Sequence, residues 1–133
     1  MKIVPRNKST EFEQWLCSIG GLINEYDNSI IMKRSYFSVG DGWLQIVKEC
    51  IENLIKEGWD KRVEQVKEKF GDLRFYIANN YAIYGDIIQK SMIKASNTCE
   101  LCGKHGRNQL VRKMLLQVIC EECLDKKQNK EEQ

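Results

Sequence analysis

The sequence predicts an α+β fold, a small sheet with flanking helices, that ends in a compact cysteine-containing module. Three observations predict it. Apolar residues recur at helical spacing after Gly42, whereas apolar and polar residues alternate between Leu73 and Ile77, and these two periodicities are typical of a helix and of a strand. Two Cys-x-x-Cys pairs follow near the end of the chain. The 133 residues have room for one domain with a small appendix.

The first forty residues predict one short helix and one strand. Residues 1–9 show no periodicity and include Pro5. A capping-box pattern at residues 10–13 begins a short helix, which ends at the glycine pair 20–21. The run at residues 30–39 is rich in β-branched and aromatic residues, which predicts a strand.

The clearest helix begins at the motif Gly40-Asp41-Gly42-Trp43. Asp41 is a residue type that is favoured at helix N-caps, and Gly58 marks the end. Between them one face is apolar and the opposite face is charged, as in a helix that packs against a core. The apolar positions are Trp43, Ile46, Val47, Cys50, Ile51, Leu54 and Ile55.

A β-hairpin follows this helix. Its two runs lie at about residues 63–67 and 73–78. The turn between them contains Gly71, which accepts the left-handed backbone that a tight hairpin turn requires. Apolar residues of the second run share one face, and Arg74 and Tyr76 share the other.

A third helix is predicted at about residues 81–96, and it leads directly into four cysteines. Their spacing is Cys99-x-x-Cys102, seventeen residues, then Cys120-x-x-Cys123. Two such pairs, separated by about 15–20 residues, are typical of a four-cysteine zinc site. We therefore predict one Zn²⁺. It would be structural, because four protein sulfurs leave no position for an activated water.

Other interpretations of the cysteines fit less well. A disulfide framework needs an oxidising compartment, a redox Cys-x-x-Cys needs no second pair, and iron–sulfur clusters use other spacings. His105, the single histidine, could replace one cysteine as a ligand. Four cysteines fill a tetrahedral site without it, so we expect His105 to be an exposed loop residue.

The residues around the second pair predict a treble-clef-like module. Glu121 and Glu122 lie between the cysteines, with lysines after them, and this order suits the dipole of a helix that begins there. A hairpin is predicted across residues 110–119. The module would then consist of a cysteine knuckle, a hairpin, and a second pair on the first turn of a helix.

Charge and composition limit the kinds of partner and the cellular compartment that the sequence allows. The chain is 42% hydrophobic and 30% charged, with a formal net charge of +2, as in ordinary globular proteins. Four thiolates and one Zn²⁺ carry about −2, so the zinc-loaded chain is near neutral, whereas nucleic-acid binding usually shows a basic excess. No apolar run approaches the roughly 18 residues that cross a membrane. Residues 1–6 begin no secretory signal, so we expect a cytoplasmic protein.

No constellation of residues predicts catalysis, and we expect no enzyme. Cys17 and Cys50 lack a neighbouring histidine that would activate them as nucleophiles, and a cysteine on an apolar stripe behaves as a small hydrophobe. The carboxylates Glu64, Glu68 and Asp72 lie near the hairpin. They alternate with lysines, which is typical of a solvated face.

The outward side chains of the hairpin are the candidate binding surface. Arg74 and Tyr76 point away from the predicted core, and Lys67 and Lys69 lie nearby in the facing run. Basic side chains beside an aromatic ring suit a ligand that carries negative charge and rings. A solvated sheet face is the other interpretation.

Three segments of the chain together resemble motifs of a known protein family. They are the motif at residues 40–43, the run QVKEKFGDLRFY at residues 65–76, and the CELCG sequence at residues 99–103 with its terminal Cys-x-x-Cys. Together they resemble a family of small uncharacterised bacterial and bacteriophage proteins, over about residues 39–123. The resemblance implies a phage or mobile-element source and an α+β domain that ends in a zinc module. It implies no activity.

These observations predict a small intracellular binding protein that zinc stabilises. We place its α+β domain at residues 1–97, its zinc-binding module at 98–125 and a polar tail at 126–133. The first hypothesis is that it binds a host or partner protein, as a phage accessory or counter-defence factor acting in the host cytoplasm. The alternatives are a DNA- or RNA-binding accessory or regulatory protein and a small-molecule or nucleotide-binding protein that uses the surface around Arg74.

If the protein binds nucleic acid, the basic residues of the module are the expected contacts. They include Arg107, Arg112 and Lys113. Binding of this kind would weaken steeply with salt, because each neutralised phosphate releases counterions.

Overall fold

The computed structural model describes residues 11, 14–16, 18–20, 22–23, 37–77 and 82–131 of the chain. Its strands are β1 (Leu22–Ile23), β2 (Phe37–Ser38), β3 (Arg62–Lys69), β4 (Asp72–Ile77), β5 (Arg107–Val111) and β6 (Leu115–Ile119). Its helical elements are the 3-10 turn η1 (Asp41–Trp43), α3 (Leu44–Lys56), α4 (Ala82–Ala95) and α5 (Glu121–Glu131). The fold is α+β, as the sequence predicts. Among the described residues, no helix combines the length and the apolar character needed to cross a membrane.

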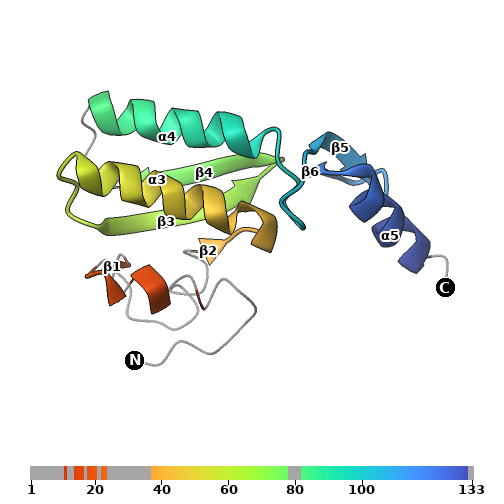
Figure 1. The fold of residues 1–133 in the computed structure, drawn as a ribbon. Helices are drawn as coiled ribbons and strands as arrows, with labels where there is room; N and C mark the ends of the chain where they lie inside the picture. Colours follow the sequence, from red (N-terminus) through yellow and green to blue (C-terminus); the bar gives the residue numbers. More distant parts are fainter. Residues whose placement is uncertain are drawn as a thin grey trace.

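Strand β3 is the centre of the larger sheet, which has four strands (Figure 1). Strand β4 runs antiparallel to β3, whereas β1 and β2 each add two residues parallel to it. Val63 pairs with β4 and also with β1, and Val66 pairs with β4 and also with β2. Since a strand residue has two edges, β1 and β2 share the edge of β3 that β4 leaves open.

A bulge in β3 brings two valines to the core. Between Val63 and Gln65 the pairing with β4 shifts by one residue, so Glu64 is an extra residue in β3. Strand side chains normally alternate between faces, and residues three apart would point in opposite directions. The extra residue shifts the alternation of side chains by one position, so Val63 and Val66 point to the same face. Both are fully buried.

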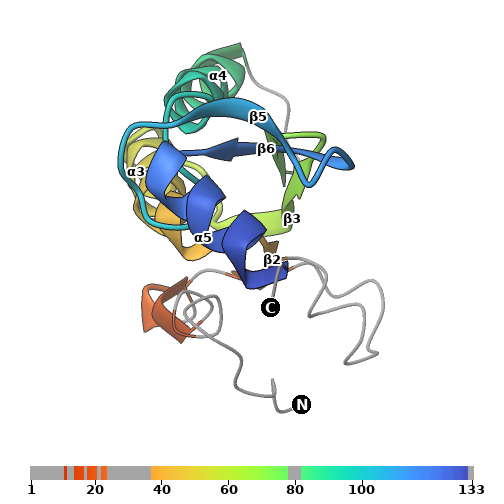
Figure 2. The same cartoon turned by 90° about the vertical axis from the view of Figure 1, so that its right-hand side faces the viewer.

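Helices α3 and α4 lie side by side on one face of the β3–β4 hairpin (Figures 1 and 2). The core between these layers is apolar, and the stripe predicted for α3 supplies much of it. Its most deeply buried members include Leu16, Trp43, Val47, Cys50, Ile51, Leu54, Val63 and Val66. Leu16 belongs to the helical residues 14–16, so the described part of the predicted first helix packs on this core.

The turn between β3 and β4 is Phe70–Gly71. Both residues have positive φ, 54° for Phe70 and 86° for Gly71, which is the backbone of a type I′ hairpin turn. The predicted hairpin and the predicted left-handed Gly71 are confirmed. The positive φ of Phe70 was not predicted, because a bulky residue is disfavoured in this backbone conformation.

Helix α3 differs from the prediction at its start and agrees with it at its end. Asp41 is not the N-cap: residues Asp41–Trp43 form a 3-10 turn, and no side chain caps it. The backbone of this turn makes its bonds with the cysteine module instead. At the other end the Gly58 N–H donates to Ile55 O at 3.0 Å, and this bond closes the helix where the sequence predicts.

Strands β5 and β6 and helix α5 form a small layer at one end of the α+β domain (Figure 1). The strands pair antiparallel, and α5 follows β6 at once. Cys99, Val111 and Ile119 are buried in a second apolar cluster. Helix α5 continues to Glu131, so most of the polar tail predicted at residues 126–133 is the end of this helix.

Part of the N-terminal prediction lies outside the described residues. The strand expected at residues 30–39 is seen at β2, and residues 30–36 are not among those described. The same holds for Thr10 and Glu13 of the predicted capping box and for Cys17.

Candidate metal centre

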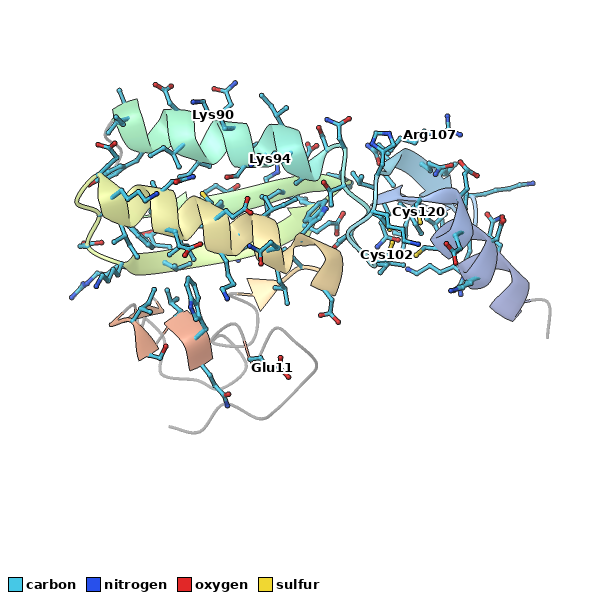
Figure 3. All side chains as sticks on the ribbon, viewed as in Figure 1. Glu11, Lys90, Lys94, Cys102, Arg107 and Cys120 are labelled. Atoms are coloured by element: carbon cyan, nitrogen blue, oxygen red, sulfur yellow. The ribbon has the colours of Figure 1, made fainter. Side chains whose placement is uncertain are left out.

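The four cysteines of the two Cys-x-x-Cys pairs come together at one point of the module (Figure 3). Cys99 and Cys102 lie on the loop before β5, Cys120 directly follows β6, and Cys123 lies in the first turn of α5. Their sulfur atoms all lie within 4.8 Å of one another. The Sγ atoms of Cys102 and Cys120 are 3.7 Å apart. The cluster could hold a metal ion.

The distances between the sulfurs fit a tetrahedral site. Metal–sulfur bonds of about 2.3 Å give a tetrahedron with sulfur–sulfur edges of about 3.8 Å. The separation of 3.7 Å between Cys102 and Cys120 is close to this edge. A closed set of four sulfurs is the donor set of structural sites, and thiolates favour soft ions over magnesium or calcium.

Backbone N–H groups fix the loop that carries the first pair and also act on the Cys99 thiol. Two hydrogen bonds close it: Gly103 N–H donates to Cys99 O at 2.9 Å, and Cys99 N–H donates to Lys104 O at 2.7 Å. Burial raises the pKa of the Cys99 thiol, but N–H groups of the surrounding residues outweigh burial and lower the pKa to about 7. The loop therefore stabilises a thiolate at this position.

The thiol of Cys123 resists ionisation because it is buried beside the other sulfurs. Burial raises the pKa of Cys123, and the adjacent sulfurs of Cys120, Cys102 and Cys99 raise it further. Four thiolates this close would repel one another strongly. A divalent cation removes the repulsion and takes the thiolates as ligands, with release of their protons. The chemistry of the cluster thus favours a bound cation.

Two ion pairs connect the first cysteine loop and β5 to helix α5. Lys104 Nζ lies 3.6 Å from Glu122 Oε2, and Arg107 Nη2 lies 3.0 Å from Glu121 Oε1. All four side chains are exposed, so each pair contributes about 0–1 kcal/mol. These pairs orient the module but do not hold it together.

The module is fixed to the α+β domain by the backbone of the turn at residues 40–43. Gly40 N–H donates to Glu100 Oε2 at 2.8 Å, and Gly42 N–H donates to Glu100 O at 2.7 Å. The indole N–H of Trp43 donates to Thr98 O at 2.8 Å. Glu100 lies between the first two cysteines, in the loop at residues 99–103, which we call the metal loop. These bonds therefore join the metal loop directly to the start of α3.

The two glycines of this turn leave no room for a side chain. A Cβ on Gly42 would lie 2.1 Å from Cys99 O and 2.5 Å from Gly103 N. A Cβ on Gly40 would lie 2.3 Å from Glu100 O. Glycine is therefore required for the two backbones to approach each other, and this close contact explains the motif, whereas the N-cap predicted at Asp41 does not.

Glu100 is a buried carboxylate, 5% exposed, with a partner for each oxygen. Besides the bond from Gly40, Gln117 Nε2 donates to Glu100 Oε1 at 3.1 Å, and Lys127 Nζ donates to Gln117 Oε1 at 3.2 Å. Burial raises the pKa of Glu100, and the bonds from Gly40 and Gln117 act against it. One chain of polar contacts thus links the 40–43 turn, the metal loop, β6 and α5.

Replacing Glu100 with glutamine is expected to destabilise the fold by about 1–3 kcal/mol. The new amide places a donor where either Gly40 or Gln117 already donates, and one buried group loses its partner. Urea unfolding of the metal-loaded chain measures the effect. The control is Asp125→Asn, an exposed residue of the same module, for which we expect a change below about 0.5 kcal/mol. Equal effects of the two changes would contradict the role given to Glu100.

Two other candidate residues lie away from the sulfur cluster. His105 is exposed, and its backbone forms a short bridge with Thr98. Among the described residues, the group that could hold a metal consists of the four cysteines without it. Cys50 is fully buried in the α+β core, where burial raises its pKa to about 11. It is a core residue, as its position on the apolar stripe predicts.

The β3–β4 pairing brings the four predicted binding residues onto one face. Lys67 lies directly opposite Arg74, and opposite residues of an antiparallel pair project from the same side. Lys69 and Tyr76 follow at two-residue spacing within their strands. Alternate residues of β4, and Val63 and Val66 on either side of the bulge in β3, are buried toward the helices, so this face is turned away from α3 and α4 (Figure 2).

The three carboxylates near the hairpin do not form a common site. Glu68 Oε2 accepts a hydrogen bond from Gly71 N–H at 2.7 Å. Glu68 lies opposite the buried Leu73, on the face of the hairpin that packs toward the core. Asp72 pairs with Arg74 at 3.5 Å, and Glu64 is the extra residue of the bulge. Their different positions leave no cluster that could hold a catalytic metal.

The structure also shows an exposed apolar surface that the sequence analysis missed. Its side chains are 44–78% exposed and gather on the β5–β6 hairpin and the neighbouring β3–β4 turn. They are Phe70, Leu110, Met114, Leu115 and Leu116. Leu115 lies opposite the buried Val111 and so projects from the other face of the hairpin, and we call the other four the hairpin patch. The run Met114-Leu115-Leu116 was the available signal, because adjacent strand residues face opposite sides and cannot all enter one core.

Comparison with known proteins gives no relative for this chain. No family model, no curated protein and no solved structure matches it. The functional argument therefore rests on the residues and the geometry described above.

Proposed function

We propose that the four cysteines bind one Zn²⁺ and that the module is treble-clef-like. The order of its parts supports this: a cysteine loop at residues 99–103, the hairpin β5–β6, and Cys123 in the first turn of α5. Four sulfur ligands leave no open position for water, so the ion supplies stability and no chemistry. It would hold together a layer that buries few residues of its own.

We propose further that the protein acts by binding another protein through the hairpin patch. The observation that carries this proposal is the exposure of large apolar side chains: Met114 is 78% exposed, Phe70 69% and Leu110 52%. Single exposed apolar residues are common, but a group on adjoining elements is typical of an interaction site. Aromatic residues and methionine are enriched in the buried centres of protein interfaces.

Leu110, Leu116 and the turn that carries Phe70 adjoin one another in the hairpin patch. Leu110 lies directly opposite Leu116 in the β5–β6 pair, so their side chains share one face. Asn108 shares that face two residues earlier, and a Cβ on Gly71 would lie 2.5 Å from Asn108 Oδ1. The turn that carries Phe70 therefore packs against the same face of the hairpin, next to the two leucines.

The contacts of the basic residues support a protein partner at this surface. Arg107 pairs with Glu121 at 3.0 Å, and Arg112 Nη2 donates to Lys127 O at 3.3 Å. Two of the three residues expected to contact nucleic acid are thus held against α5. Apart from Phe70, the side chains of the hairpin patch neither pair with phosphates nor offer the aromatic faces on which bases stack.

In this proposal the protein is not an enzyme and works by occupying a surface of its partner. A phage or mobile-element source rests on the resemblance of residues 39–123 alone. A role as an accessory or counter-defence factor in the host cytoplasm rests on the same resemblance.

Affinity purification from bacterial cells tests the protein-binding proposal. The baits are the zinc-loaded wild-type chain, the double variant Leu110→Ser/Leu116→Ser, and Ile93→Ser. Ile93 lies on α4, is 58% exposed and is outside the hairpin patch. We expect one protein to be retained in stoichiometric amount by the wild type and by Ile93→Ser, and about tenfold less of it by the double variant. Retention by all three baits alike, or by none, would contradict the proposal.

A further inference from the structure

A second surface of the molecule lies on the outer face of the β3–β4 hairpin. Lys67 and Arg74 lie opposite each other in the two strands. Lys69 is two residues along β3 and Tyr76 two residues along β4, so the four side chains form two short rows on one face. Neighbouring positions in such rows are about 5 Å apart across the strands and about 7 Å apart along them.

The charges of this face are unbalanced. The paired residues present three cations, Lys67, Lys69 and Arg74, against one carboxylate, Asp72. Arg74 Nη2 lies 3.5 Å from Asp72 Oδ2. Within the described part of the chain, Lys67 and Lys69 form no ion pair, and Lys69 Nζ lies 5.9 Å from the ring centroid of Phe70. The local field therefore attracts an anionic ligand although the whole chain is nearly neutral.

Tyr76 adds an aromatic ring to the same face. Its side chain is 44% exposed and follows Arg74 at two-residue spacing. A base can stack on an exposed ring while cations beside it contact the flanking phosphates. Bases within a duplex are already stacked on one another. β3 and β4 belong to a four-stranded sheet whose other face packs on helices, so they are not a free two-stranded ribbon of the kind that enters a major groove. The combination therefore suits a single strand rather than a duplex.

We propose that this face binds single-stranded nucleic acid, with a base stacked on Tyr76 and phosphates bound by Lys67, Lys69 and Arg74. The proposal goes beyond the protein-binding function and does not depend on it, because its contacts do not use the leucines of the hairpin patch. Asp72 opposes binding, since it competes with phosphate for Arg74.

Fluorescence anisotropy with a short labelled oligothymidylate and the full zinc-loaded chain tests the proposal. We expect binding at low salt and a fall of affinity as salt rises. For three phosphate contacts the slope of log K against log salt is about −2, and Lys67→Ala should reduce its magnitude by about 0.7. The same sequence as a duplex should bind at least about tenfold more weakly.

Matched variants separate the contacts from a merely structural effect. Tyr76→Ala should weaken binding by about fivefold or more, whereas Tyr76→Phe, which keeps the ring, should bind nearly as the wild type does. Asp72→Asn should tighten binding, because it removes the competing carboxylate. Lys90→Ala is the charge control: Lys90 is exposed on α4, in the layer on the other side of the sheet (Figure 3), and its loss should leave the salt slope unchanged.

Several results would overturn the proposal. These are no binding at low salt, equal effects of Lys67→Ala and Lys90→Ala, or a duplex that binds as tightly as the single strand. Displacement of the oligonucleotide by polyglutamate at equal charge concentration would assign the face to an acidic peptide instead. None of these results depends on whether a protein binds at the hairpin patch. The protein-binding proposal and the single-strand proposal can therefore be contradicted independently.

Discussion

Replacing Cys99 with serine is expected to abolish metal binding and to unfold residues 98–131 in a chain that is otherwise folded. A serine hydroxyl does not ionise near neutral pH and is a poor substitute for the thiolate ligand. Structural zinc contributes about 10–16 kcal/mol of apparent free energy in zinc-finger peptides. The module has a core of few buried residues, and an isolated two-stranded hairpin is marginally stable.

Elemental analysis and amide hydrogen exchange measure this result. The wild type should contain one zinc per chain and Cys99→Ser none, with protection lost in β5, β6 and α5 and kept in α3 and β3. The control is Cys50→Ala, which removes another fully buried cysteine from the α+β core and should leave the zinc content unchanged. A Cys99→Ser chain that keeps its zinc, or keeps protection throughout the module, would show that the proposed metal centre is wrong.

Replacing Gly42 with alanine is expected to destabilise the protein by about 3 kcal/mol or more. The new Cβ would lie 2.1 Å from Cys99 O and 2.5 Å from Gly103 N. Both are backbone atoms of the metal loop, so neither can turn aside as a flexible side chain would. The metal loop must then separate from the turn at residues 40–43, and the bond from Gly42 N–H to Glu100 O at 2.7 Å is lost.

Urea unfolding of the zinc-loaded chain measures this effect, with Gly85→Ala as the matched control. Gly85 lies in α4, and a Cβ there would meet no atom within 4 Å. Alanine is the better helix former, so this control should raise the free energy of unfolding by about 0.5–1 kcal/mol. The same substitution is thus expected to have opposite signs at the two sites. A Gly42→Ala chain as stable as the wild type would contradict the close contact between the two backbones.

The two results are expected to be coupled through the docking contacts. Loss of the metal releases the loop that accepts hydrogen bonds from Gly42 N–H and from the indole N–H of Trp43. Gly42→Ala removes the same docking from the other side. The double variant Cys99→Ser/Gly42→Ala should therefore lose less stability than the sum of the single changes, because residues that share an interface are not additive.

Much of the fold was predictable because it follows from local patterns. The apolar stripe of α3 and the alternation in β4 are periodicities that one element imposes on its own residues. The turn at Gly71 follows from a backbone angle that few residues accept, and the spacing of the cysteines follows from the size of a metal site. The bulge at Glu64 was not predictable in this way, because it depends on the register with β4.

By itself the sequence determined the α+β class, the β3–β4 hairpin and the four cysteines that could hold a metal, since each is encoded within a short stretch. The tertiary structure alone decided how these parts meet. It showed that Gly40 and Gly42 accommodate the backbone of the metal loop, that Glu100 is the buried acceptor that joins the two units, and that Leu110 and Leu116 form one exposed surface with the turn of Phe70. Contacts between segments some sixty residues apart leave no periodicity in the chain, because the close approach of two backbones is a property of the folded molecule.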